Sequence, residues 1–240
     1  MNFFINRRKS LLLLAGGLSG CTAMTTTSTQ AQSKMVVDDG TSEITPVYVM
    51  THNESQSSTF VRADFYFYDA KKDVELRPGA SIKVNGIELQ RDPKELASYI
   101  GTIPMPHGLL TFEFTRTPGK AIKHSFALPE LEIVEAPKLY RVGEKLTITV
   151  NHRSPRAGVA SDTYNVDIRG NGRYTFATES SDGSRIVFRP ILKNVGFPSG
   201  PATAYIYRQQ RTPLRDLSSD LQTGWAVASR SRDFAIEIAD

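Results

Sequence analysis

Apolar and polar residues alternate in short segments from about Ile44 to the end of the chain. In one of the clearest segments, Phe65 and Phe67 alternate with Tyr66 and Tyr68. A period of two is typical of a β-strand, because successive side chains point to opposite faces of a sheet. The pattern predicts strands, with the phenylalanines of this segment in a core and its tyrosines on an outer face.

Turn sequences separate these segments. Asn85-Gly86 suits a two-residue hairpin turn, because both residue types tolerate a positive φ angle. Pro118-Gly119, Gly170-Asn171-Gly172 and Asp182-Gly183 separate further pairs of segments. About seven strands are expected on each side of a boundary near Leu131, a spacing typical of antiparallel sandwiches.

We therefore expect an all-β protein with two tandem antiparallel β-sandwich domains, residues 44–131 and 132–240. The pattern resembles that of immunoglobulin-like and fibronectin-like domains. A single large β-barrel is the alternative, but Pro129-Glu130-Leu131-Glu132 is typical of a connector between domains. One short helical turn is expected at Asp92-Pro93-Lys94-Glu95, where the aspartate caps and the proline takes the first helical position.

The start of the chain has a different pattern. Arg7, Arg8 and Lys9 precede an apolar stretch over residues 11–18, and small residues follow. A membrane-spanning helix needs roughly 20 apolar residues, which is more than this stretch contains. The order of charged, apolar and small residues predicts a cleaved signal peptide over residues 1–20.

The segment Leu18-Ser19-Gly20-Cys21 resembles the lipobox of bacterial lipoproteins. The resemblance covers only the start of the chain, but the motif is specific. It implies cleavage before Cys21, which becomes the new N-terminus and carries acyl chains such as palmitate. Because two or more acyl chains hold stably in a bilayer, the resemblance implies a lipid anchor in a bacterial envelope.

The route and the membrane follow from the flanking residues. Arg7-Arg8 resembles a twin-arginine export signal, but Ser10 stands where that signal prefers phenylalanine, so general secretion is favoured. Thr22 follows the cysteine where an aspartate favours retention in the inner membrane of Gram-negative bacteria. The family pattern therefore implies the outer membrane, if the organism has one.

Residues 21–43 are expected to form a flexible tether, because they are rich in Thr, Ser and Gln. The acidic pair Asp38-Asp39 is expected to stay solvated. Loss of residues 1–20 lowers the basic residues from 29 to 26 against 25 acidic ones, a net charge of +1. This balance does not favour nucleic-acid binding. With Cys21 acylated, no thiol remains for a disulfide.

The chain contains none of the local motifs that carry catalysis, such as a nucleophile elbow, a zinc-protease motif or a phosphate loop. Its four histidines are scattered, and none has a second histidine or a cysteine within a few residues; they are His52, His107, His124 and His152. We therefore expect a protein that is not an enzyme and that has no metal and no cofactor. A hydrolase acting on the cell wall or on an extracellular polymer is the alternative.

Tyr66 and Tyr68 are the candidate binding surface, because outward aromatic rings suit sugar stacking or a protein contact. The alternative is that both tyrosines pack against a neighbouring loop or the second domain, with only their hydroxyls in contact with solvent. Trp225 is expected in a core. The C-terminal arginines are expected to share a solvated surface with acidic residues; they are Arg208, Arg211, Arg215, Arg230 and Arg232.

The expected function is therefore that of a membrane-anchored, non-catalytic envelope lipoprotein. Its partners would be the bilayer, through Cys21, and an envelope protein or a glycan. A structural spacer within an envelope complex is the other non-catalytic alternative.

Overall fold

The computed structural model is all-β in the residues that it describes, and it contains no helix there. The described residues are 36–40, 42–67, 72–95, 97–106, 108–117, 120–151, 154, 157–170, 173–182, 184–190, 199–214, 221 and 223–239. They all belong to one compact unit, Ser33–Asp240. The signal peptide, the lipobox with Cys21, and also Tyr68, His107 and His152 lie outside these residues. Over the same ranges, no helix is long and apolar enough to cross a bilayer.

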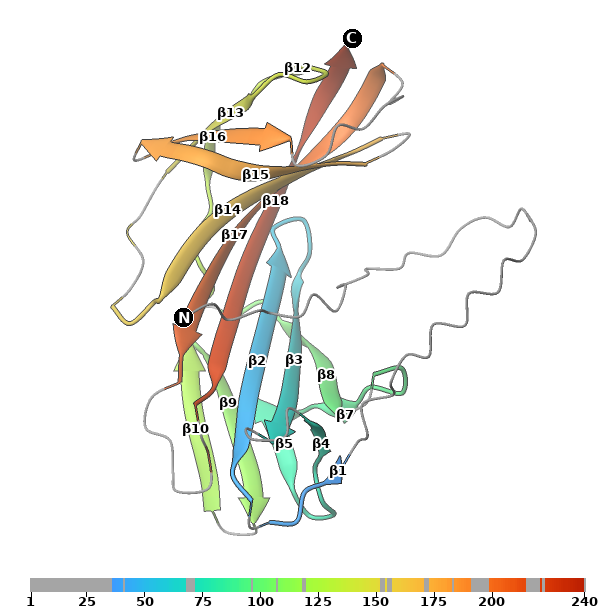
Figure 1. Cartoon of the computed structure of the whole chain (residues 1–240), viewed down its shortest axis with the longest axis vertical. Helices are drawn as coiled ribbons and strands as arrows, with labels where there is room; N and C mark the ends of the chain where they lie inside the picture. Colours follow the sequence, from blue (N-terminus) through green and yellow to red (C-terminus); the bar gives the residue numbers. More distant parts are fainter. Residues whose placement is uncertain are drawn as a thin grey trace, which may run out of the picture. The chain divides into compact units, whose positions relative to one another are not determined.

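The strands are numbered in the order in which they follow one another along the described chain (Figure 1). Their bounds are β1 (Val36–Val37), β2 (Ile44–Asn53), β3 (Ser58–Phe67), β4 (Lys72–Glu75), β5 (Ser81–Val84), β6 (Ile87–Glu88), β7 (Gln90–Arg91), β8 (Ser98–Pro104), β9 (Leu110–Thr117), β10 (Lys120–Phe126), β11 (Ile133–Glu135), β12 (Leu139–Arg141), β13 (Leu146–Val150), β14 (Ser161–Arg169), β15 (Arg173–Asp182), β16 (Arg185–Pro190), β17 (Gly200–Pro213) and β18 (Trp225–Ala239).

Within the described chain, these strands form a 14-stranded sheet and a 4-stranded sheet. The main path of the large sheet is β1-β4-β3-β2-β18-β17-β14-β15-β16-β13-β11, and the small sheet has the order β10-β9-β5-β6. The sheets depart from the expected antiparallel arrangement at three described pairs, β1/β4, β12/β18 and β2/β18, which are parallel. A parallel pair needs a long connection, and β2 and β18 lie near opposite ends of the folded chain.

The predicted hairpin turn at Asn85-Gly86 is confirmed. Asn85 and Gly86 have φ angles of 49° and 83°, and they join β5 to β6 with Val84 opposite Ile87. The antiparallel pairs β9/β10, β14/β15 and β15/β16 flank the other three predicted turns. Turn chemistry at Asn85-Gly86 therefore sets the β5/β6 register locally.

The predicted helical turn at residues 92–95 is wrong. The Lys94 N–H donates to Asp92 Oδ1 (2.8 Å), and the Asp92 N–H donates to the Ser98 carbonyl (2.8 Å). The aspartate caps a bend, because the chain must return to pair β7 with β8 within a few residues.

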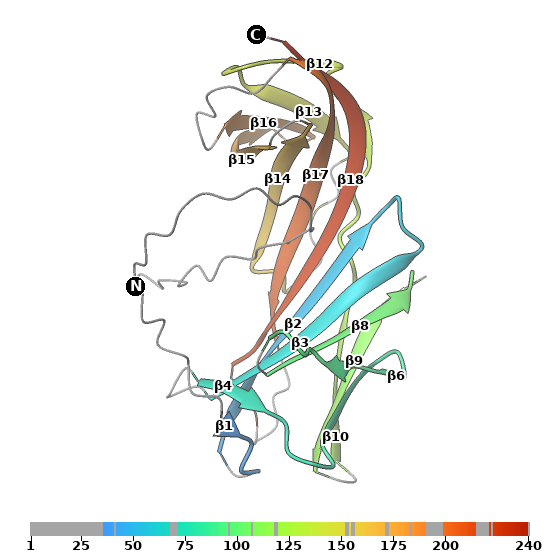
Figure 2. The ribbon, with the colours of Figure 1, turned by 90° about the vertical axis from the view of Figure 1, so that its right-hand side faces the viewer.

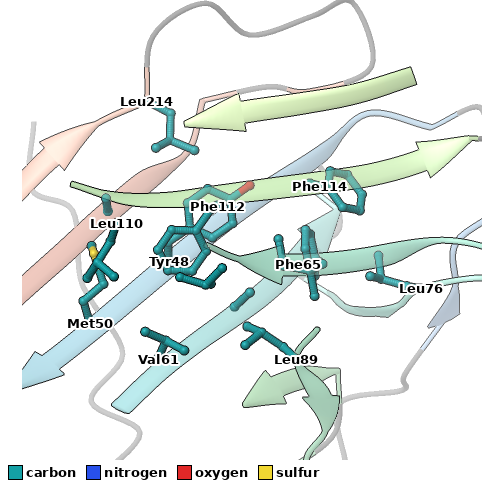
Figure 3. Close-up of a cluster of buried hydrophobic side chains, with 14 of the residues drawn as sticks. Tyr48, Met50, Val61, Phe65, Leu76, Leu89, Leu110, Phe112, Phe114 and Leu214 are labelled. Atoms are coloured by element: carbon teal, nitrogen blue, oxygen red, sulfur yellow. The ribbon is translucent and has the colours of Figure 1, made fainter. Parts of the chain in front are cut away.

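Two hydrophobic clusters form the cores. The first contains residues of both sheets, such as Tyr48 and Phe65 from the large sheet and Phe112 and Phe114 from the small one (Figure 3). The second cluster contains Tyr140, Leu146, Ile148, Val150, Tyr164, Val166, Ile168, Phe176, Ile186, Phe188 and neighbouring residues. Each buried apolar side chain that leaves water stabilises its cluster by roughly 1.5–3 kcal/mol.

The C-terminal strand β18 contributes to both clusters, and it pairs along its length with β17, which contributes to the second (Figure 2). Ala226 and Ala228 belong to the first cluster, whereas Ile206 and Ile236 belong to the second. The start of β18 pairs with β2 from Trp225 to Ser231, and its end pairs with β12. The division into domains 44–131 and 132–240 stays a prediction. Residues beyond 132, such as Ala226 and Ala228, belong to the first cluster.

A row of polar residues crosses the large sheet between the two clusters. Tyr164 lies opposite Arg208, Arg208 opposite Arg230, Arg230 beside His52, and His52 opposite Thr59. All five lie on the core-facing side of their strands, and all except Arg230 are buried. This polar row separates the two apolar clusters along strands that are shared by both.

The prediction that Asp38 stays solvated is wrong. The Asp38 N–H donates to the Glu75 carbonyl (2.8 Å), which continues the β1/β4 ladder and places the carboxylate beside Arg116. Arg116 donates to both carboxylate oxygens, from Nε to Oδ2 (3.0 Å) and from Nη2 to Oδ1 (2.6 Å). Asp38 is only 3% exposed, whereas Asp39 is exposed as predicted. Backbone pairing therefore brings the end of the predicted tether into the fold.

Candidate binding surface

The predicted alternation along β3 is confirmed for the residues that the structure describes. Phe65 is fully buried in the first cluster, and Phe67 packs against that cluster. Tyr66 points to the opposite side and is half-buried, with Thr45 and Asp73 as its strand neighbours. The other half of the predicted surface, Tyr68, lies outside the described residues.

Tyr66 belongs to a larger surface, which we call the outer face. It consists of the side chains of four neighbouring strands that point away from both clusters. They are Phe60, Arg62, Asp64 and Tyr66 on β3; Thr45, Val47, Val49 and Thr51 on β2; Trp225, Val227 and Ser229 on β18; and Gln209, Arg211 and Pro213 on β17. Residues paired directly across a ladder share one face of the sheet, so the registers define this surface.

The parallel β2/β18 ladder assembles the outer face from both ends of the folded chain. Trp225 lies beside Val47, and Val47 lies opposite Asp64. Asp64 is thus two strands away from Trp225, and Tyr66 follows Asp64 by two residues on β3. This places the Cα atoms of Tyr66 and Trp225 about 12 Å apart. The two ladders therefore bring Tyr66 and Trp225, which are far apart in the sequence, onto the same surface.

Arg62 and its carboxylate partners occupy the β3 side of the outer face. Arg62 Nε donates to Asp64 Oδ2 (2.9 Å), and Nη1 donates to Glu95 Oε2 (2.8 Å). The Ser98 hydroxyl donates to Asp64 Oδ1 (2.6 Å). Burial raises the pKa of Asp64, although the charge of Arg62 and the hydrogen bond from Ser98 oppose the rise. This cluster is internally satisfied and holds β3 to β8.

Trp225 lies on the outer face, so its predicted place in a core is wrong. It is half-buried, because the alternation along β18 turns Ala226 and Ala228 into the first cluster and leaves Trp225 and Val227 outside. The Arg211 guanidinium stacks over its indole ring, 3.7 Å from the ring centroid. Stacking of this kind is worth about 0.5–1 kcal/mol at exposed sites.

Arg211 differs from other arginines of the same sheet surface. Its side chain has no ion pair and no hydrogen bond with any residue that the structure describes. On the continuation of this surface, Arg169 lies over the Tyr205 ring (4.7 Å), 3.6 Å from Asp167 Oδ2, and donates to the Tyr207 hydroxyl (3.2 Å). Arg169 and Arg62 each hold a carboxylate, and Arg211 does not.

Two pockets lie on the opposite, core-facing side of β17. One pocket has a volume of about 120 Å³, with Met50, Phe126 and Ala226 in its wall, and a second has a volume of about 160 Å³. Ala127 and Gln210 line both pockets. The walls of the first are largely apolar, so it offers packing space and no cluster of acid–base groups.

Arg208 lines the second pocket but is already engaged. Its Nε and Nη2 atoms donate to Asp162 Oδ1 (3.1 Å) and Oδ2 (2.6 Å), and Nη1 donates to the Glu130 carbonyl (2.8 Å). Its guanidinium lies 5.4 Å from the centroid of the Tyr164 ring. Burial raises the pKa of Tyr164 to about 12, the positive charge of Arg208 opposes this rise, and Asp162 adds to it.

The described histidines lie in the interior. His52 is fully buried, with Nδ1 3.1 Å from the Ser58 carbonyl and 3.3 Å from the Thr59 hydroxyl. His124 is buried with its ring centroid 5.8 Å from that of Tyr48. Over the described ranges, no group of three His, Cys, Asp or Glu side chains is placed to hold a metal ion.

Sequence reasoning missed the Trp225–Arg211 stack and the Arg208–Asp162 pair. Residues 225–228 read Trp-Ala-Val-Ala, in which both alternating sets are apolar, so the pattern does not say which set faces the core. The pairing of Arg208 with Asp162 depends on the β14/β17 ladder, which no local motif signals.

No family model matches the chain, and no curated protein matches it. Among solved structures, the chain is distantly similar to the crystal structure of domains 4 and 5 of the S-layer protein SbsC, with 12% identity, 73% of this chain and 82% of that chain covered, and a TM-score of 0.22. It is also distantly similar to SGBP-B of the Bacteroides ovatus mixed-linkage glucan utilization locus, solved with a mixed-linkage heptasaccharide, with 11% identity, 77% and 60% covered, and a TM-score of 0.18. Likenesses this distant carry no argument about function.

Proposed function

We propose that this protein is a membrane-anchored, non-catalytic envelope lipoprotein that binds an envelope protein or a glycan through the outer face of its large sheet. The observation that carries the proposal is the assembly of Phe60, Tyr66, Trp225 and Arg211 on one sheet surface by the β2/β18 ladder. Phe60 is 41% exposed, and the other three are half-buried. Outward aromatic and arginine side chains are the residue types that dominate binding surfaces.

The outer face stands on what we infer to be a β-sandwich. Side chains of the two sheets meet in the first cluster, where the rings of Tyr48 and Phe112 stack at 4.4 Å and those of Phe65 and Phe114 lie 4.8 Å apart. Two sheets that share a core in this way support a sandwich module. The second cluster supports a second module, and β18 contributes residues to both clusters.

The anchor rests on the resemblance of Leu18-Ser19-Gly20-Cys21 to a lipobox. We expect wild-type protein to fractionate with membranes and a Cys21→Ser variant to appear in the soluble fraction. Membrane association that survives Cys21→Ser would remove the anchor from the proposal without touching the outer face.

Binding is tested by affinity capture from detergent-solubilised membranes and from envelope polysaccharide, with the full-length protein as bait. We expect a Phe60→Ala, Tyr66→Ala double variant to lose the partner that wild type retains. Val134→Ala is the matched control, because Val134 is 66% exposed and lies on β11, outside the outer face. Leu109→Ala tests the apolar pocket, which Leu109 lines while being 51% exposed. Loss of the partner in Leu109→Ala alone would move the binding site to that pocket.

A structural spacer is the second candidate, and the contribution of β18 to both cores favours it. A long strand that is paired with β17 along its length and continues through two cores resists bending between them, as a spacer requires. If wild type and the Phe60→Ala, Tyr66→Ala variant retain the same proteins and glycans, the spacer replaces the binding role.

A further inference from the structure

The Trp225–Arg211 stack has the geometry of a contact point for an anion. The guanidinium carbon lies 3.7 Å from the centroid of the indole ring, and this ring contact uses none of the N–H donors of the group for a hydrogen bond. The side chain has no carboxylate partner in the described part of the chain. A planar, pre-oriented guanidinium binds a carboxylate through two parallel hydrogen bonds.

The neighbours of Arg211 on the same face are uncharged. Ser161 lies opposite Arg211 on β14, Thr163 lies opposite Gln209, and Ser229 lies opposite Gln209 on β18. Side chains directly opposite each other have Cβ atoms about 5 Å apart, so Ser161 and Val227 flank Arg211 directly. Thr163, Gln209 and Ser229 lie two residues along the strands, on the side of Arg211 away from Trp225, and with Ser161 they form a polar rim beside it. Gln209 Nε2 donates to the Ser229 hydroxyl (3.4 Å), while Ser161, Thr163 and Gln209 are exposed.

This rim favours a sugar over a protein as the partner. Hydroxyl and amide groups both donate and accept hydrogen bonds, as the hydroxyl groups of a sugar require. Protein partners are held mainly by apolar anchors in desolvated pockets, and the apolar pocket near Ala226 opens on the other side of the sheet. Because removal of residues 1–20 leaves a net charge of only +1, attraction of an anion here must be local.

We propose that the outer face binds an acidic polysaccharide of the uronic-acid type, with a sugar carboxylate on Arg211 and neighbouring sugar hydroxyls on Ser161, Thr163, Gln209 and Ser229. This inference rests on the proposed function and deepens it, because it names the ligand class of the same surface. Trp225 is a positioning residue: it orients the guanidinium through its ring.

The test is a binding titration of the full-length, detergent-solubilised protein with polygalacturonate as the probe. We expect Arg211→Gln to weaken binding about tenfold or more, and Arg211→Lys to retain part of it, since lysine keeps the charge without the planar fork. Arg141→Gln, which changes an exposed arginine of β12, is the matched control and should bind as wild type does. Methyl-esterified polygalacturonate should bind wild type as weakly as the acid form binds Arg211→Gln.

Polyglutamate distinguishes a sugar from an acidic peptide. Binding of polyglutamate to wild type as tight as that of polygalacturonate would overturn the inference, as would unchanged binding in Arg211→Gln or no binding by wild type. If Arg211→Gln binds polygalacturonate as wild type does, while the Phe60→Ala, Tyr66→Ala variant loses the captured partner, this inference fails and the proposed function stands. If no outer-face substitution alters any binding, both fail.

Discussion

Arg208 and Arg211 lie three residues apart on β17, and each lies over an aromatic ring, yet their surroundings are opposite. Arg208 points toward the cores, its side chain is 1% exposed, and it holds Asp162 and the Glu130 carbonyl. Arg211 points to the outer face and holds only the Trp225 ring in the described structure. Burial makes the difference, because a buried charge must be paired whereas a solvated one need not be.

The largest effect expected is the loss of stability in Arg208→Met. Removal of the guanidinium leaves the Asp162 carboxylate, 12% exposed, without its partner, which should cost about 3–5 kcal/mol in the free energy of unfolding. Urea unfolding followed by circular dichroism measures this. An Arg208→Met, Asp162→Leu double variant should recover part of the loss, and a single variant as stable as wild type would remove the contrast between the two arginines.

Next in size is the loss expected for Gly224→Ala, just before Trp225. A Cβ atom there would lie 2.5 Å from the Pro46 carbonyl oxygen and 2.6 Å from Leu214 Cδ1, so overpacking should cost about 1–3 kcal/mol. Gly108→Ala is the control, because its Cβ would meet nothing within 4 Å, and we expect a change of less than about 0.5 kcal/mol. Thermal or urea unfolding of both variants measures the two changes in the free energy of unfolding, one at a site in close contact and one at an open site.

Arg211→Met should change stability by less than about 1 kcal/mol, because it removes only the stack on Trp225. Urea unfolding of Arg211→Met and of Arg208→Met, at the same pH and salt, compares the two losses in the free energy of unfolding directly. Equal losses in the two variants would mean that Arg211 is structural and that its exposure has been misjudged.

At neutral pH no effect is expected for the ionisation of Tyr164, the ring beside Arg208, and its effect is confined to alkaline pH. Burial raises its pKa to about 12, above the value of about 10 in an unfolded chain, so the folded state keeps its proton longer. Its contribution to stability is complete below pH of about 10 and is lost as pH rises toward about 12. Unfolding free energies measured across this range should fall less steeply in Tyr164→Phe than in wild type.

Local sequence was sufficient to predict individual strands and turns. Asn85-Gly86 predicted its hairpin because positive φ is a property of those two residues, and the alternation along β3 correctly separated Phe65 from Tyr66. The same reasoning was wrong at Asp38 and Trp225. The environment of each depends on a strand from a distant part of the chain, β4 for the first and β2 for the second.

The sequence by itself determined which residues alternate, where the chain turns, and that the start of the chain resembles a lipobox at Cys21. The expectation that Arg208 and Arg211 share one solvated surface is wrong for Arg208, because β17 runs through both residues and turns them to opposite faces of the sheet. Only the tertiary structure decided which side became a core. That choice depends on the β2/β18 and β14/β17 ladders, whose free energy comes from burying both clusters at once, and no local pattern contains a contact between strands so far apart in the chain.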